Sequence, residues 1–180
     1  MRHKNFIILA LAGSTLVAAG MALWPLFVFL PTAALRALIL APLYALFVNI
    51  ILTRVQFAGA LLAFSLVPGV ILLIFTPLLL PVSVLAGVAA EAVAWLLGKV
   101  LRVSPWQKHK TLRWFGAALF PALQFPLMLS ALAVTVGGPS AGLVASPGLV
   151  ALVTVIGIVP GLFGCWLGEQ ISSRLRGLKN

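Results

Sequence analysis

Arg36 is the residue whose surroundings most suggest chemistry. It stands alone in the apolar stretch LPTAALRALILAP, from Leu30 to Pro42. Its guanidinium offers a planar fork of N–H donors that fits a carboxylate or a phosphate. Two interpretations stay open. The side chain either binds an anionic ligand in a cavity that opens outward, or it reaches the lipid headgroups and has no further role.

The remaining inventory of reactive groups is small. The chain has two acidic residues, Glu91 and Glu169, two histidines, His3 and His109, and one cysteine, Cys165. A hydrolase needs a nucleophile beside a base, and a metalloenzyme needs several ligands close together. Neither set can be assembled from these residues at their expected positions. We therefore predict that the chain is not an enzyme, holds no metal ion and carries no cofactor.

Glu91 lies in an apolar run, where a lone carboxylate is costly unless it is paired. We expect it to pair with Arg54 or Arg113 of neighbouring helices, and contact with a partner protein is the alternative. Glu169 lies close to Arg174 near the end of the last apolar run. We expect Glu169 to be a solvated surface charge.

The overall composition indicates a membrane protein. Of the 180 residues, 63% are hydrophobic and 8% are charged, and the mean hydropathy is +1.22. A soluble domain of this size cannot hide so much apolar surface from water. The formal net charge of +10 does not indicate nucleic-acid binding, because the basic residues lie between hydrophobic runs rather than along one helix face.

The N-terminus allows two interpretations. The basic MRHK, the apolar residues after it and the small residues at 17–19 match a cleavable signal peptide. The apolar run continues to Leu30, however, and this length favours an uncleaved first membrane helix.

Six hydrophobic runs of membrane-spanning length divide the chain, and turn-like or polar segments separate them. We expect an all-α integral membrane protein, a bundle of six transmembrane helices in a single domain that covers residues 1–180. The expected helices cover residues 6–24, 33–51, 57–75, 78–97, 112–136 and 149–167.

The basic residues predict the orientation of these helices. Eleven of the twelve lie at the two termini, in the turn after the second run and in the loop after the fourth. Positive residues collect on the cytoplasmic side of a membrane. We therefore expect both termini in the cytoplasm, and a multi-pass protein of the inner (plasma) membrane. Arg36 then lies near the outer end of the second helix.

Small residues follow the first expected helix at intervals of four, at Ala10, Ser14 and Ala18. Such stripes let helices approach each other closely in lipid. The stripe packs either within the chain or against a partner subunit, and the sequence leaves both interpretations open.

Several stretches resemble the substrate-binding S components of energy-coupling factor (ECF) vitamin transporters. APLYALFVNIILTRVQFAGALL is similar to a stretch of one S-component branch, where a helix ends in a short basic turn and a glycine-containing helix follows. LAGVAAEAVAWLLGKV is similar to that branch's small-residue helix with one glutamate, here Glu91. SPWQKHKTLRWFGAALF is similar to its basic loop and aromatic-rich helix. Ala10, Ser14 and Ala18 are a degenerate form of the family's Ala-x-x-x-Ala motif.

This resemblance implies a function and a set of partners. The chain would capture a vitamin or similar micronutrient from the outside, an anionic one if Arg36 takes part, for ATP-driven uptake. The implied protein partners are a transmembrane T component and two cytoplasmic ATPases. The residues implied in partner contact are Ala10, Ser14, Ala18 and Glu91.

The resemblance also implies a substrate pocket at the outer ends of the helices. Arg36 would hold an anionic group, Trp24 would stack on the substrate, Tyr44 and Gln124 would form hydrogen bonds, and residues 137–148 would form a lid. The alternative function is a structural or assembly subunit of a larger membrane complex. Such a subunit would bind no small molecule and would use its small-residue stripe and basic loop to hold other proteins.

Overall fold

Helices account for nearly all of the part of the chain that the structure, a computed structural model, describes: residues 2–23, 25, 33–74, 77–135 and 147–177. No strand occurs within these ranges, which confirms the prediction of an all-helical fold. The helices are α1 (Arg2–Ala22), α3 (Ala33–Arg54), α4 (Ala60–Leu72), α5 (Leu79–Val100), α6 (Lys110–Thr135) and α8 (Pro147–Gly177), with a short 3-10 helix, η1 (Trp106–Lys108).

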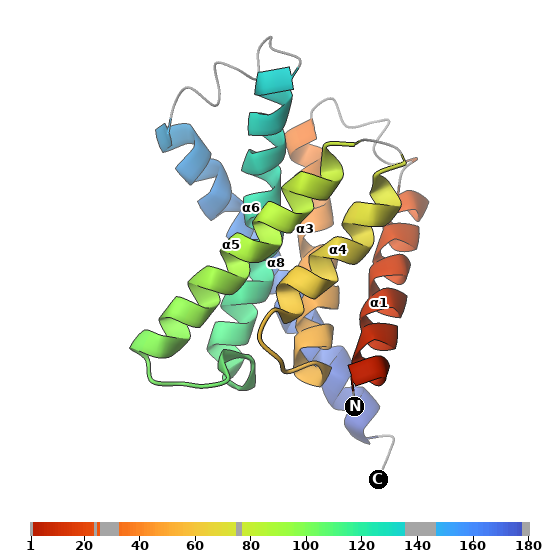
Figure 1. The fold of residues 1–180 in the computed structure, drawn as a ribbon, viewed down its shortest axis with the longest axis vertical. Helices are drawn as coiled ribbons and strands as arrows, with labels where there is room; N and C mark the ends of the chain where they lie inside the picture. The colour runs from red at the N-terminus through yellow and green to blue at the C-terminus, as the bar shows by residue number, and fades with distance from the viewer. Residues whose placement is uncertain (1, 24, 26–32, 75–76, 136–146, 178–180) are drawn as a thin grey trace.

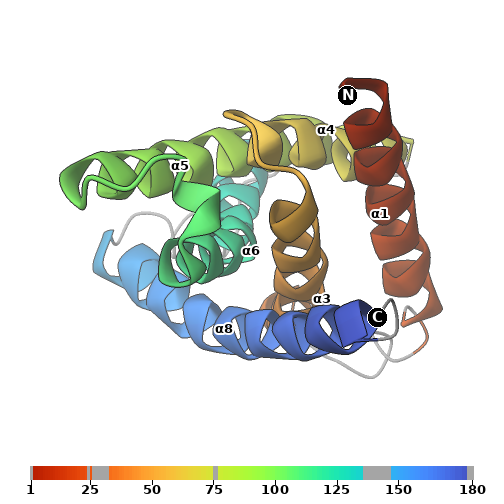
Figure 2. The same cartoon turned by 90° about the horizontal axis from the view of Figure 1, so that it is seen from below.

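The helices run alternately up and down, so that both ends of the chain lie at the same end of the bundle (Figure 1). The turn after α3 and the loop after α5 lie at this end too. It is called the basic end here, because Lys4, Arg54 and the cations of the loop after α5 belong to it. Seen from below, α3 and α6 lie in the centre, with α4 and α5 on one side, α8 on the opposite side, and α1 at the edge, where it packs on α4 and α3 (Figure 2).

Four helical segments are long and apolar enough to cross a membrane: His3–Ala22, Leu79–Val100, Lys110–Thr135 and Val150–Arg174. The apolar segments of α3 and α4, Ile39–Arg54 and Ala60–Leu72, are shorter. Large hydrophobic side chains cover much of the outer surface, and Ile74, Val134 and Val159 are among the most exposed. A surface of this kind indicates a membrane-embedded protein, because water would not tolerate so large an apolar area.

Hydroxyl groups on the helices bond to their own backbone, as an apolar medium requires. The Thr15 hydroxyl donates to the carbonyl of Leu11 at 2.7 Å, although Thr15 is exposed. The Ser130 hydroxyl donates to the carbonyl of Pro126 at 2.8 Å. Each hydroxyl is therefore satisfied without water.

Glycines allow α8 to pack tightly against both central helices. They lie four, three and four residues apart, at Gly157, Gly161, Gly164 and Gly168. A Cβ at Gly161 would lie 3.0 Å from the Cα of Ala118 in α6, and a Cβ at Gly164 would overlap the carbonyl oxygen of Pro42 in α3. Only a residue without a side chain allows backbones to come so close.

Several helix boundaries differ from those expected by a few residues, and two of the differences have a clear local reason. The expected third helix began at residue 57, whereas α4 begins at Ala60 because Gly59 adopts a left-handed conformation, with φ of 88°. The last helix extends to Gly177 rather than ending near residue 167. Hydropathy marks only its apolar part, while polar residues such as Glu169 continue the helix and bond to the bundle.

Candidate functional site

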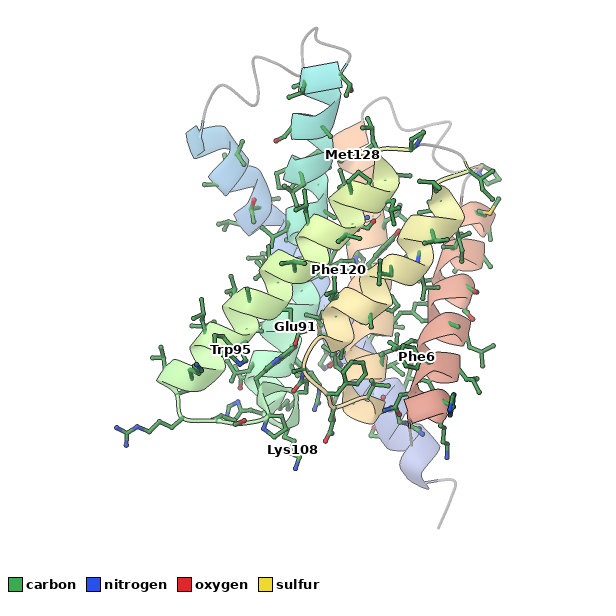
Figure 3. The ribbon with its side chains drawn as sticks, in the orientation of Figure 1. Phe6, Glu91, Trp95, Lys108, Phe120 and Met128 are labelled. Atoms are coloured by element: carbon green, nitrogen blue, oxygen red, sulfur yellow. The ribbon has the colours of Figure 1, made fainter. Side chains whose placement is uncertain are left out.

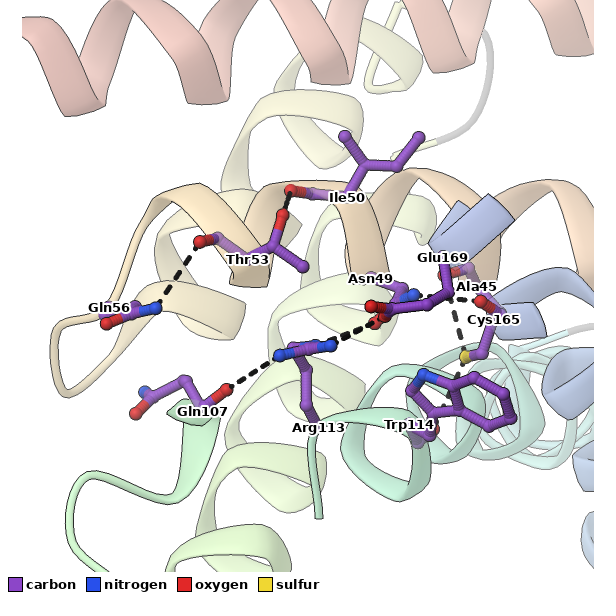
Figure 4. A network of polar contacts seen from close by, with 10 residues as sticks. All are labelled: Ala45, Asn49, Ile50, Thr53, Gln56, Gln107, Arg113, Trp114, Cys165 and Glu169. Atoms are coloured by element: carbon purple, nitrogen blue, oxygen red, sulfur yellow. Dashed lines mark hydrogen bonds and ion pairs between the residues drawn. The ribbon is translucent and has the colours of Figure 1, made fainter. Parts of the chain in front are cut away.

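Arg113 forms the centre of a buried polar network at the basic end (Figure 4). Its side chain starts from the first turn of α6, and the residue is only 8% exposed. Its Nε donates to the Asn49 side-chain oxygen at 3.0 Å, and its terminal nitrogens donate to the Gln107 carbonyl at 3.3 Å and to Glu169 Oε2 at 2.7 Å. A buried arginine is stable only with such partners.

The network links three helices, the loop after α5 and the turn between α3 and α4. Asn49 of α3 donates from its side-chain nitrogen to the Cys165 carbonyl of α8 at 2.9 Å. Gln107 of η1 donates to the Phe57 carbonyl, just before α4, at 3.0 Å. The free thiol of Cys165 is buried against the Trp114 carbonyl. These contacts close the basic end of the bundle with hydrogen bonds.

Glu169 is therefore not the solvated surface charge expected from the sequence. It forms an ion pair with Arg113, with its side chain only 22% exposed. The expectation was wrong because α8 continues as a helix past its apolar part, which places Glu169 beside the first turn of α6.

Glu91 pairs with backbone amides and not with Arg54 or Arg113. Its two carboxylate oxygens accept from the N–H of Gly59 at 3.1 Å and of Leu61 at 2.9 Å. The Trp106 indole N–H donates to the same carboxylate at 3.2 Å. Glu91 therefore caps the N-terminus of α4, where the helix dipole favours a negative charge. Figure 3 shows it on the part of α5 nearer the basic end.

Trp106 fills the gap between α5 and α6 beside this carboxylate. A Cβ at Gly98 would lie 3.0 Å from the Trp106 Cβ, and one at Gly116 would lie 3.0 Å from its ring. Trp106 is almost fully buried. The basic loop is thus held to the bundle by an aromatic wedge as well as by hydrogen bonds.

Tyr44 and Gln124, two of the predicted substrate-binding residues, lie together inside the bundle. The Tyr44 hydroxyl lies near the Gln124 side chain. The Gln124 side-chain nitrogen also donates to the Ser83 hydroxyl at 3.0 Å. We call Tyr44, Gln124 and Ser83 the polar trio; it joins α3, α6 and α5. Gln124 lies one helical turn from both Phe120 and Met128, in the half of α6 away from the basic end (Figure 3).

Aromatic rings border the polar trio. The ring centroids of Tyr44 and Phe120 are 6.3 Å apart, and those of Phe64 and Phe120 are 6.0 Å apart. This combination of neutral hydrogen-bonding groups with aromatic walls suits a small organic molecule better than an ion. Within the described ranges, no group of three or more histidine, cysteine, aspartate or glutamate residues lies close enough to hold a metal ion.

The remaining predicted site residues differ in whether the structure describes them. Trp24 and nearly all of the lid, residues 136–146, lie outside the described residues. The backbone of Arg36 belongs to the first turn of α3, but its side chain is also outside the described part. Ala10, Ser14 and Ala18 all lie on the exposed side of α1 and take no part in the core.

Sequence reasoning missed Asn49, Gln107 and Ser83. Asn49 and Ser83 are fully buried polar residues in otherwise apolar helices. That pattern was visible in LFVNIIL and LPVSVLAG, because a polar residue in a membrane helix usually faces the protein interior. The role of Gln107 left no such signal, since it depends on how the loop folds back.

Comparisons of the chain with protein-family models, with curated protein sequences and with solved structures give no match. Any function must therefore be argued from the residues and their geometry.

Proposed function

We propose that this chain is the membrane-embedded, substrate-binding subunit of an importer of the ECF type, which captures a vitamin-like micronutrient from the outside. In this proposal all six apolar helices cross the membrane, and both termini are cytoplasmic. Partner subunits, a transmembrane component and two ATPases, supply the energy. The position of the basic residues at one end of the bundle supports this orientation.

The observation that carries the proposal is the polar trio of Tyr44, Gln124 and Ser83. Polar side chains inside a membrane bundle are costly and are usually retained for function. These three come from three different helices and meet away from the basic end. A substrate that enters from the opposite end would meet hydrogen-bonding groups bordered by aromatic rings.

The closed basic end also supports a binding subunit. The Arg113 network and the Glu91 cap fill that end with hydrogen bonds. A subunit that receives its substrate from outside must not leak toward the cytoplasm. The closed end would provide this seal until partner subunits act.

A structural or assembly subunit is the second candidate, and one observation favours it. Ala10, Ser14 and Ala18 lie exposed on α1, where a small-residue stripe lets another membrane helix pack closely. The same surface would serve an importer's transmembrane partner. The two functions are therefore distinguished by whether the protein binds a small molecule, and not by this surface.

The test is mass spectrometry of the gently purified protein, read for bound small molecules and for bound proteins. We expect a stoichiometric small molecule that is lost in Gln124→Leu and Tyr44→Phe. Arg36→Ala should abolish its binding if the molecule is anionic. Ser130→Ala is the matched control, because Ser130 bonds only to its own helix in the described contacts.

The opposite result would be a protein without any small molecule that stays attached to membrane proteins lacking ATPase motifs. That outcome would replace the importer by the assembly subunit.

A further inference from the structure

The basic end carries more positive charge than the chain can neutralise. The sequence has twelve lysines and arginines but only two acidic residues. Glu91 is engaged by the amides that begin α4, and Glu169 is engaged by Arg113. The exposed cations Lys99, Arg102 and Lys108 therefore need anions from outside the protein.

Two tryptophan–lysine pairs at the basic end lie where the membrane interface is expected. The Lys99 ammonium lies 3.9 Å from the ring centroid of Trp95, and the Lys110 ammonium lies 4.9 Å from that of Trp114. In both pairs the lysine is one turn nearer the basic loop than its tryptophan, although α5 and α6 run in opposite directions. Tryptophan rings prefer the membrane interface, and lysine reaches the headgroups beyond it.

The end of α5 combines exposed charge with exposed apolar surface. Val100 is 77% exposed and Leu101 is 56% exposed, between Lys99 and Arg102, which are exposed as well. Arg102 adopts a left-handed conformation, with φ of 56°, and its N–H bonds back to the Lys99 carbonyl at 3.1 Å. The backbone thus fixes the turn on which this cation lies.

We propose that the rim formed by Trp95, Lys99 and Arg102 binds the headgroup of an anionic phospholipid. The two cations contact the phosphate, the Trp95 ring lies at the interface, and Val100 and Leu101 contact the upper part of the acyl chains. This interaction does not depend on the importer function, because it needs only a membrane-embedded bundle.

A lipid fits this rim better than an acidic protein does. Trp95 is 46% exposed and lies on the part of α5 that is apolar enough to cross a membrane. An acidic protein in water would leave Val100 and Leu101 without an apolar partner. A phospholipid supplies the phosphate and the hydrocarbon together, which free phosphate does not.

The experiment places the whole chain in two kinds of phosphatidylcholine nanodisc, one with phosphatidylglycerol at about 30% of the lipid and one with none. Native mass spectrometry then counts the phospholipids that stay bound after release from the disc. The test variant is Lys99→Gln with Arg102→Gln. The control variant, Lys4→Gln with Lys108→Gln, removes the same charge from exposed residues at the same end that have no aromatic partner among the described contacts.

A basic residue that contacts a lipid headgroup should contribute roughly fivefold to the preference for anionic lipid, and in this proposal Lys99 and Arg102 make that contact whereas Lys4 and Lys108 do not. The measured quantity is the ratio of retained phosphatidylglycerol to retained phosphatidylcholine. We expect this ratio to fall at least tenfold in the test variant and less than threefold in the control variant. Inorganic phosphate should not displace the lipid. Both double variants change only exposed side chains, so both should fold.

Three results would overturn the proposal. Equal losses in the two variants would show a diffuse charge effect without a local site. No preference of the unaltered protein for phosphatidylglycerol would show that the rim does not select anionic lipid and would leave an acidic protein as its partner. Displacement by inorganic phosphate would show a site for the free anion. None of these results would affect the test of the bound micronutrient.

Discussion

The guanidinium of Arg113 and the carboxylate of Glu169 lie 2.7 Å apart and join α6 to α8 at the basic end. These residues are 56 positions apart in the sequence, and nothing between them marks them as partners. The same guanidinium also bonds to Asn49 and to the Gln107 carbonyl. Arg113 therefore holds more of the network together than Glu169 does.

Arg113→Met should destabilise the protein more than Glu169→Gln. Removing the arginine takes one donor from the Glu169 carboxylate and from two other acceptors, which costs about 3 kcal/mol of unfolding free energy. Glutamine at position 169 keeps one acceptor oxygen, so that its cost is about 1 kcal/mol. Thermal unfolding in detergent, followed by tryptophan fluorescence, measures both. Equal losses would mean that the ion pair alone matters and that Asn49 and Gln107 add nothing.

Gly164→Ala should disrupt the packing of α8 on α3. The new Cβ would meet the carbonyl oxygen of Pro42, which belongs to the backbone and cannot rotate away. Overpacking of this kind costs about 2 kcal/mol or more. Gly148→Ala is the control, because a Cβ there meets nothing within 4 Å. Folded yield and melting temperature should fall only for Gly164→Ala, and an equal fall in both would point to a general loss of glycine flexibility.

Glu91→Ala should loosen the start of α4. Without the carboxylate, the amides of Gly59 and Leu61 lose their acceptor, at a cost of about 2 kcal/mol. Hydrogen–deuterium exchange at these amides should become faster, and Glu91→Gln should fall between the alanine variant and the natural protein. Unchanged exchange together with loss of a protein partner would show instead that Glu91 serves the partner.

Arg102→Gly should make the protein more stable in neutral detergent. Arg102 occupies the position after α5 that glycine favours, and the Val103 N–H bonds to the Gly98 carbonyl at 2.8 Å, as in a Schellman motif. Relief of the left-handed conformation contributes about 1 kcal/mol. Leu101→Gly, at a φ of −83°, should destabilise the protein and is the control. A lower melting temperature for Arg102→Gly would show that the arginine side chain itself stabilises the turn.

Hydropathy and turn residues were sufficient to predict the helical fold, because lipid-facing helices need long apolar runs. Tyr44 and Gln124 were named together only because of the family resemblance; they lie near each other in the bundle, and their role in binding a substrate stays a prediction. The partners of Glu91 and Glu169 could not be predicted. Both depend on which helix ends meet, and the choice between an arginine and a row of backbone amides is decided by angstrom-scale packing.

The glycine face of α8 has a consequence for how the protein is made. The ribosome completes α3 and α6 before it reaches Gly157, so the surface on which α8 packs exists before α8 does. Because Cys165 and Glu169 lie on the same helix, the hydrogen bonds to Asn49 and Arg113 form only when α8 arrives. Completion of the bundle and closure of its basic end therefore both depend on α8, the last of these helices to be synthesised.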